Sequence, residues 1–137
     1  MPELKRYAVF ISHAWDYSPE YYRFVNLLNN AQNFLWANYS VPEDDPLHNE
    51  KSKKAILEGL KRHMKPVNVV CILSGMYTSH SDWMQQEIDM AVEIGKPRIG
   101  VMPYGSQRIP QAVQDAADEI VGWSTGSIVS AIRKLAI

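Results

Sequence analysis

The apolar run from residue 67 to residue 73 constrains the fold more than any other feature of the sequence. It reads Val67-Asn-Val-Val-Cys-Ile-Leu73 and lies between Pro66 and a Ser-Gly pair. A short apolar run of this kind, without alternation, predicts a strand that is buried on both of its faces. Strands of this type occur in parallel sheets that helices cover on both sides. The run therefore indicates an α/β domain.

An amphipathic helix is expected next, from about residue 82 to residue 94, with Ser79 or Ser81 as its N-cap. At about 100° per residue, one broad apolar arc of this helix holds Met90, Trp83, Ile94, Ala91, Met84, Ile88 and Val92. Glu87 falls inside the arc, whereas the two other acids after the first turn lie on the opposite side. An unpaired buried charge is costly, so Glu87 must be paired, protonated or in use. The wheel alone leaves a structural ion pair and a functional acid equally open.

The rest of the chain alternates between short apolar runs and helical patterns. Further strands are expected at 7–11, 34–40, 98–102 and 119–121, and further helices at 19–35, 50–64, 111–117 and 127–137. This order repeats a β-α unit about five times with short connections. It predicts one domain over residues 1–137, a flavodoxin-like three-layer sandwich with a five-stranded parallel sheet and helices on both faces.

Composition excludes several classes of protein. The 137 residues are 46% hydrophobic, which suffices for one core, and the net charge of -1 argues against a nucleic-acid surface. No apolar segment approaches the roughly 20 residues that span a bilayer, and the first residues do not resemble a signal peptide. We therefore expect a cytoplasmic protein without a membrane partner. Cys71 lies within the buried strand, so we expect an inert core thiol.

In parallel α/β sheets, ligands bind beyond the carboxyl ends of the strands, where the strand order reverses. The segments expected there are 12–16, 41–49, 74–83 and the loop after residue 102. Ser12-His13 provides neither the acidic pair of a response regulator nor the glycine-rich phosphate cradle of a flavodoxin or P-loop protein. The acidic residues and His48 of the proline-rich loop have no recognised ligand spacing, so we expect no metal.

Three segments resemble TIR domains. The pattern Ser74-x-x-Tyr77-x-x-x-Ser81-x-Trp83-x-x-x-Glu87 is similar to the motif that carries the glutamate of NAD-cleaving TIR domains. It departs from that motif by one extra residue between the tyrosine and the second serine, and by Met84 in place of a cysteine. Residues 7–14 resemble the first TIR box, and residues 94–99 resemble the segment that leads into the fourth strand. The resemblance covers most of the chain in order.

The glycine-free, proline-rich region 36–47 is similar to the TIR-like subfamily that includes the ThsB proteins of bacterial Thoeris anti-phage systems. The resemblance implies an enzyme that cleaves the nicotinamide-ribose bond of NAD and makes a cyclic or modified ADP-ribose signal for a separate effector protein. NAD is then the substrate and no further cofactor is expected. TIR-TIR self-association on activation is also implied, although the unusual loop weakens this point.

The resemblance assigns the catalytic role to Glu87. It suggests a substrate-binding set in which aromatic and polar residues form a wall for the nicotinamide or the diphosphate, others shape the ribose pocket, and the proline-rich loop closes over them. This set is Phe10, Ser12, His13, Trp15, Asp45, Ser74, Tyr77 and Trp83.

Two other functions remain open. The first is a non-catalytic TIR interaction module, against which Glu87 argues because a scaffold needs no acid in an apolar arc. The second is an enzyme similar to nucleoside deoxyribosyltransferases, which shares the glycosyl chemistry but takes a different substrate.

Overall fold

The computed structural model describes residues 5–13, 19–41, 52–77, 81–102 and 109–137. Five strands form one sheet, and every pair of neighbours is parallel. The strands are β1 (Arg6–Ser12), β2 (Leu35–Asn38), β3 (Val69–Leu73), β4 (Arg98–Val101) and β5 (Glu119–Val121). Their order in the sheet is β2-β1-β3-β4-β5. The order reverses between β1 and β3, which places the switch point at the ends of these two strands.

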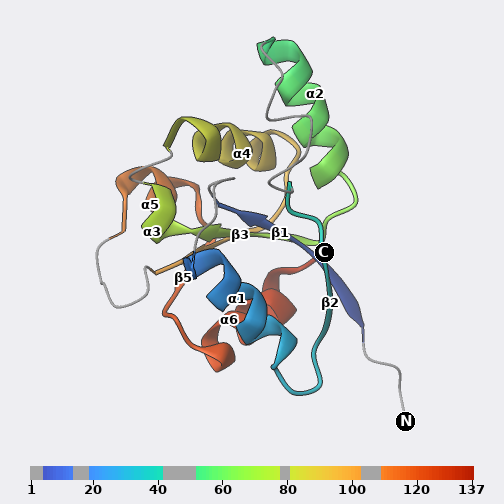
Figure 1. The fold of residues 1–137 in the computed structure, drawn as a ribbon, viewed down its shortest axis with the longest axis vertical. Helices are drawn as coiled ribbons and strands as arrows, with labels where there is room; N and C mark the ends of the chain where they lie inside the picture. The colour runs from blue at the N-terminus through green and yellow to red at the C-terminus, as the bar shows by residue number, and fades with distance from the viewer. Residues whose placement is uncertain (1–4, 14–18, 42–51, 78–80, 103–108) are drawn as a thin grey trace.

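Helices cover both faces of the sheet (Figure 1). On one face lie α1 (Pro19–Asn29) and α6 (Thr125–Leu135), and on the other lie α2 (Lys53–Met64) and α4 (Ser81–Glu93). The short α5 (Gln111–Ala116) packs against α4 and β4, and α3 (Ser74–Tyr77) is a single turn directly after β3. This is the three-layer α/β arrangement that the sequence predicts.

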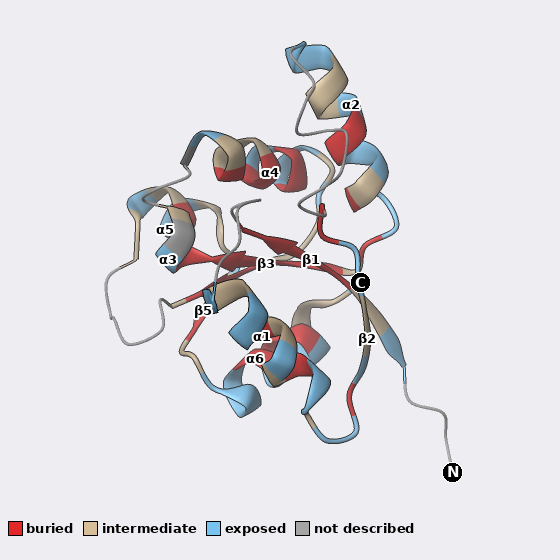
Figure 2. Cartoon of the chain, in the orientation of Figure 1, coloured by how far each residue is buried: buried red, intermediate tan, exposed pale blue. Residues whose placement is uncertain are grey.

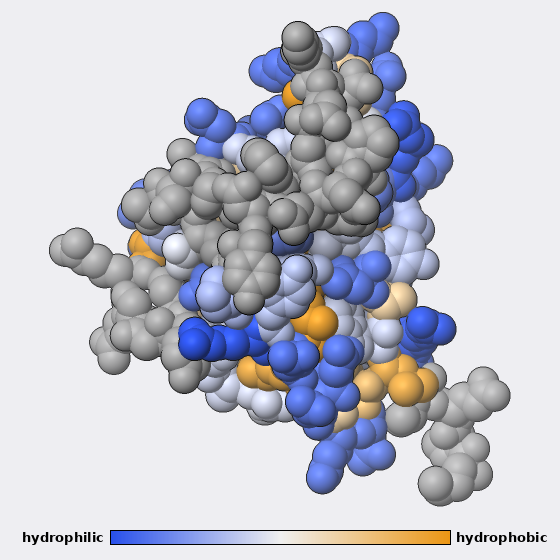
Figure 3. Space-filling view, viewed as in Figure 1, coloured by the Kyte–Doolittle hydropathy of each residue, from blue (hydrophilic) through white to orange (hydrophobic). Residues whose placement is uncertain are grey.

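Burial follows the predicted pattern most closely at the centre of the sheet. All five residues of β3 are buried, as Figure 2 shows in red for the middle strands. The helices contribute apolar side chains from one face each, among them Phe24, Leu60, Ile88 and Ile132. The buried Cys71 has its thiol pKa raised to about 12 by loss of solvation, which confirms an inert core thiol. The exposed face of α2 is hydrophilic (Figure 3).

Several boundaries differ from the predictions. Helix α1 ends at Asn29 rather than residue 35, and Asn33 adopts a left-handed backbone with φ of 55°. Asparagine tolerates that conformation and is a weak helix former, so the polar stretch ends the helix although apolar spacing continues. The predicted start of α2 at residue 50 lies outside the described residues. Within them, Ser52 caps the helix, and its hydroxyl accepts a hydrogen bond from the Ala55 backbone amide at 3.4 Å.

The surroundings of α4 differ in three further details. Residues 74–77 form a helical turn between the predicted strand and the predicted helix, which the sequence pattern does not predict. Ser81 is the first residue of α4 rather than its N-cap, and Ser79 lies outside the described residues. Val92 is 50% exposed, so the predicted apolar arc is too broad at this residue. Helix α4 ends before Gly95, whose φ of 71° favours glycine.

Candidate active site

The buried polar residues gather at one end of the sheet. Among the described residues these are Ser12, His13, Ser40, Ser74 and Glu87. The first four lie at or just after the carboxyl ends of β1, β2 and β3, and the glutamate comes from α4. Buried polar groups are expensive unless they are bonded or functional. Their concentration at the switch point marks the candidate site.

Glu87 is fully buried, with 0% of its surface exposed. Its Oε1 atom accepts a hydrogen bond from the Ser12 hydroxyl at 2.9 Å. Its Oε2 atom has no hydrogen-bond partner among the described residues, and neither does the buried Oγ atom of Ser74. Two buried oxygen atoms at the same sheet end therefore retain the capacity to bind a ligand.

Burial dominates the electrostatics of Glu87. Loss of solvation raises the pKa of this carboxyl well above its usual value. The Ser12 hydroxyl, the backbone amide of His13 and the Trp83 side chain act in the opposite direction by stabilising the charged form, but their effect is smaller. Burial therefore makes the ionised form of this carboxyl more costly than in a solvated glutamate, and a nearby cation would lower that cost. Among the described residues, the ion pairs found do not include Glu87, so a functional acid stays the prediction.

Three other residues from the predicted substrate-binding set lie at the site. His13 is buried, and its backbone amide contributes to the pKa of Glu87. Trp83 stands one helical turn before Glu87 on α4 and is half-buried. Ser74 is the first residue after β3. Ser12, the His13 backbone and Trp83 contact the carboxylate, and Ser74 lies at the same end of the sheet. The contact of these residues with a substrate stays a prediction.

The remaining members of the predicted set are placed differently. Phe10 is fully buried within the hydrophobic core, so its ring presents no surface to a ligand in this structure. The Tyr77 hydroxyl bonds to Gln85, which lies about 200° around the helix from Glu87. The structure therefore does not bring this hydroxyl to the carboxylate. Trp15, Asp45 and the loop that contains Asp45 lie outside the described residues.

Sequence reasoning did not single out Glu20, which the structure places beside the site. A Cβ atom added at Gly75 would lie 2.7 Å from both carboxylate oxygens of Glu20. The carboxylate thus rests against the backbone of α3, next to Ser74. An acid in the first turn of a helix ordinarily complements the helix dipole, so the sequence offers no signal of this contact.

This contact predicts a measurable coupling between Glu20 and Gly75. The change in the free energy of unfolding caused by Gly75→Ala should be less favourable in the parent protein than in a Glu20→Ala background. We expect a difference of about 0.5–1 kcal/mol, because the added methyl must displace the carboxylate. Chemical denaturation of the four proteins of this double-mutant cycle measures the difference. Additive effects within about 0.3 kcal/mol would show that the contact does not form in solution.

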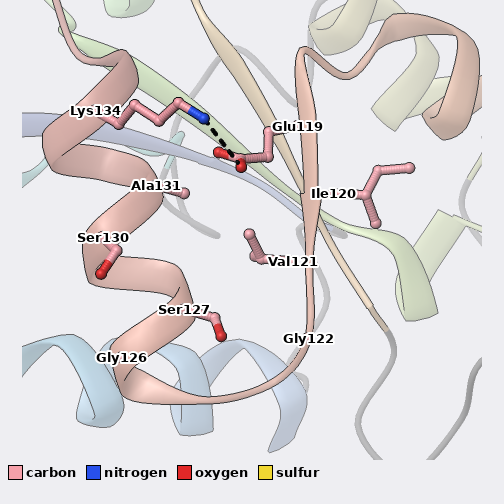
Figure 4. Close-up of a pocket in the computed structure, with 9 residues that line it drawn as sticks. All are labelled: Glu119, Ile120, Val121, Gly122, Gly126, Ser127, Ser130, Ala131 and Lys134. Carbon is pink, nitrogen blue, oxygen red and sulfur yellow. Dashed lines mark ion pairs between the residues drawn. The ribbon is translucent and has the colours of Figure 1, made fainter.

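A separate groove of about 480 Å³ lies between β5 and α6 (Figure 4). Its walls are mostly small residues, and Lys134 Nζ lies 3.5 Å from Glu119 Oε1 across it. The groove is two strands away from the β1/β3 switch point. No member of the predicted substrate-binding set that the structure describes lines this groove.

The fold and the site together define a TIR-like α/β domain: a five-stranded parallel sheet with a buried glutamate from α4 at its switch point, contacted by a serine from β1. Residues 10–108, more than two thirds of the chain, match the family model for the TIR-like domain of Thoeris protein ThsB. The chain belongs to this family of anti-phage TIR-domain proteins, which confirms the resemblance seen in its motifs. No curated protein matches the chain. Among the described residues, none of the helices has both the length and the apolar character of a membrane span.

Proposed function

We propose that this protein cleaves the nicotinamide-ribose bond of NAD during phage infection and releases a cyclic or modified ADP-ribose that activates a separate effector. Membership of the Thoeris ThsB family supports the role in defence. The chemistry is supported chiefly by one observation, the fully buried Glu87 with a partner on only one of its oxygens among the described residues.

A buried acid of this kind suits a cationic reaction centre. The nicotinamide ring of NAD carries a positive charge, and breaking its bond to ribose passes through an oxocarbenium-like centre. Either charge close to Glu87 would favour the ionised carboxylate and offset the desolvation that raises its pKa. As the bond breaks, the positive charge moves from the ring nitrogen towards C1′, so a carboxylate next to C1′ would stabilise the transition state more than it stabilises bound NAD. That difference is the requirement for catalysis.

In the proposed reaction, the bond between C1′ of the ribose and the ring nitrogen breaks, and its electron pair moves to that nitrogen. Nicotinamide leaves as a neutral molecule, so no separate general acid is required. The Glu87 carboxylate stabilises the positive charge that develops at C1′. Water or a nucleophile within the same nucleotide then attacks C1′ and loses its proton to solvent or to a base. A cyclic or transferred product requires that water be excluded during this last step.

Ser12 holds the carboxylate in place for this reaction. Its hydroxyl donates to Oε1 over 2.9 Å, and the serine is itself fixed within the central part of the sheet. The Oε2 atom then remains for the ribose or the reaction centre. The adjacent Ser74 hydroxyl can hold a ribose hydroxyl.

The experiment that tests this proposal compares nucleotides in cells. Bacteria expressing the parent, Glu87→Gln or Glu93→Gln are challenged with phage, and their nucleotides are measured by mass spectrometry. Glu93 is an exposed acid of the same helix, so its replacement controls for the change of Glu to Gln. We expect an ADP-ribose-derived species in cells with the parent and the Glu93→Gln protein, and none with Glu87→Gln. Phage protection without any change in NAD or its derivatives would favour a non-catalytic interaction module.

A further inference from the structure

A hydrogen bond to the preceding strand determines that Nδ1 of the His13 imidazole carries a proton. Its Nδ1 atom lies 2.8 Å from the carbonyl oxygen of Ile11. A carbonyl oxygen only accepts hydrogen bonds, so Nδ1 must carry the proton. In the neutral ring, Nε2 then carries the lone pair.

The same ring is fixed in orientation by α1. The rings of His13 and Tyr21 stack with their centroids 3.9 Å apart and their planes within 10° of parallel. Tyr21 stands in the first turn of α1, directly after Glu20. Stacking on a tyrosine that is itself anchored restricts the imidazole to one plane.

The last residue of β2, Asn38, anchors Tyr21 in turn. The Asn38 Nδ2 atom donates to the Tyr21 hydroxyl over 2.8 Å. The Oδ1 atom of Asn38 accepts from the Ser40 backbone amide at 3.0 Å and from the Ser40 hydroxyl at 2.5 Å. Because a backbone amide can only donate, this fixes which end of the Asn38 side chain faces Tyr21.

These contacts form a closed circuit. The Ser40 Oγ atom accepts from the backbone amide of Ile11 at 3.0 Å, and the carbonyl of the same Ile11 holds His13. These hydrogen bonds and the ring stack thus connect the His13 imidazole to three separate elements, β1, β2 and α1. A circuit of this kind goes beyond what packing requires, because Asn38 is exposed and contributes no core volume.

We propose that Tyr21 and Asn38 are positioning residues of the candidate active site, which hold His13 as its Nδ1–H tautomer with its backbone amide directed at Glu87. They act through His13 and need not touch the ligand. The consequence for substrate recognition rests on the proposed function. A neutral His13 has no N–H to give to a diphosphate, because Nδ1–H is committed to Ile11 and Nε2 carries none. Of the two roles that the sequence leaves open for this wall, the neutral form of His13 therefore suits the nicotinamide, whereas a protonated ring would donate Nε2–H to a diphosphate.

Long-range ¹H–¹⁵N NMR of the histidine ring nitrogens tests the proposal without any activity assay. Spectra of the ligand-free protein at about pH 8, where an ordinary histidine is neutral, should show the His13 signal as the Nδ1–H tautomer. Its absence from the spectrum of His13→Gln assigns the signal. Tyr21→Leu, which removes the stack, should shift His13 furthest towards the Nε2–H form. Asn38→Ala and Tyr21→Phe each remove the hydrogen bond to the Tyr21 hydroxyl but keep the ring, so each should cause a smaller shift and leave most of the Nδ1–H form.

Product formation in phage-challenged cells gives a second readout. At equal protein levels and similar melting temperatures, Tyr21→Leu should lower the nucleotide product about tenfold, as is usual for positioning groups, and Tyr21→Phe should restore most of it. Tyr39→Leu, at an exposed tyrosine next to Asn38, is the matched control and should have no effect on either readout. An Nε2–H tautomer in the parent, or an unchanged tautomer in Tyr21→Leu and Asn38→Ala, would overturn the proposal. A parent with the Nδ1–H tautomer but no NAD-derived product would contradict the proposed function and leave the positioning role supported.

Discussion

Replacing Glu87 by glutamine should lower the rate of nicotinamide release from NAD by about 10³-fold, the scale of loss when a preorganised electrostatic group is removed. Glutamine has nearly the same shape and can still accept the Ser12 hydrogen bond, so the site should keep its geometry. What disappears is the negative charge that would stabilise the oxocarbenium-like centre. Release of nicotinamide by activated protein, followed by chromatography, measures the effect.

A graded series separates this charge effect from disturbed packing. Ser12→Ala should reduce the rate by about tenfold to a hundredfold, because a hydrogen bond to a charged group is worth about 1.5–3 kcal/mol. Glu93→Gln, the same substitution at an exposed position of α4, should leave the rate unchanged. Equal activity of Glu87→Gln and the parent would remove Glu87 from the reaction. Loss of activity together with loss of the folded state would instead identify a structural ion pair.

Local patterns in the sequence predict the fold well because each one reports burial directly. The apolar run before Ser74 becomes β3, which is buried along its whole length. The acid inside the apolar arc of α4 becomes the fully buried Glu87. The β-α order also places Ser12 and Ser74 at the carboxyl ends of two parallel strands, and these ends lie at the same edge of the sheet. These three relations depend only on periodicity and topology.

Contacts between side chains distant in sequence could not be predicted in the same way. Tyr21 fits the apolar spacing of α1, and nothing in that spacing indicates a stack on His13. The contact between Glu20 and Gly75 depends on how α1 sits relative to the end of β3. Phe10 matches an aromatic position of the TIR pattern, yet the orientation of β1 directs it into the core. Motifs identify residue types, whereas the packing of helices on the sheet decides which side chains face the site.

The second large effect concerns stability, and it also centres on Glu87. Burial raises the pKa of this carboxyl well above its ordinary value of 4.5. Above about that pH, the unfolded chain has lost the proton while the folded protein retains it, so the unfolded state binds fewer protons. Stability must then fall as pH rises, until the raised pKa of the folded state is passed. Below about pH 4.5 both states are protonated and this contribution is absent.

Glutamine at position 87 does not titrate, so Glu87→Gln removes this loss of stability. The melting temperature of the variant minus that of the parent should be smallest near pH 4 and should grow by several degrees towards pH 8, since 1 kcal/mol corresponds to about 4 °C in a domain of this size. Burying the glutamine amide has the same cost at every pH, so it shifts the difference in melting temperature equally at every pH and leaves its dependence on pH unchanged. Glu93→Gln should give a nearly flat difference, because Glu93 is exposed.

Calorimetric scans of the three proteins at matched ionic strength measure these slopes. A difference that stays flat, or that falls with rising pH, would mean that the folded protein already holds Glu87 ionised against a cationic group. The carboxylate would then have no need of a cationic ligand, and the electrostatic argument for NAD as its substrate would fail. A difference that rises with pH would mean that the folded protein buries Glu87 without a cationic group beside it. This is expected of a site whose positive charge comes from its ligand.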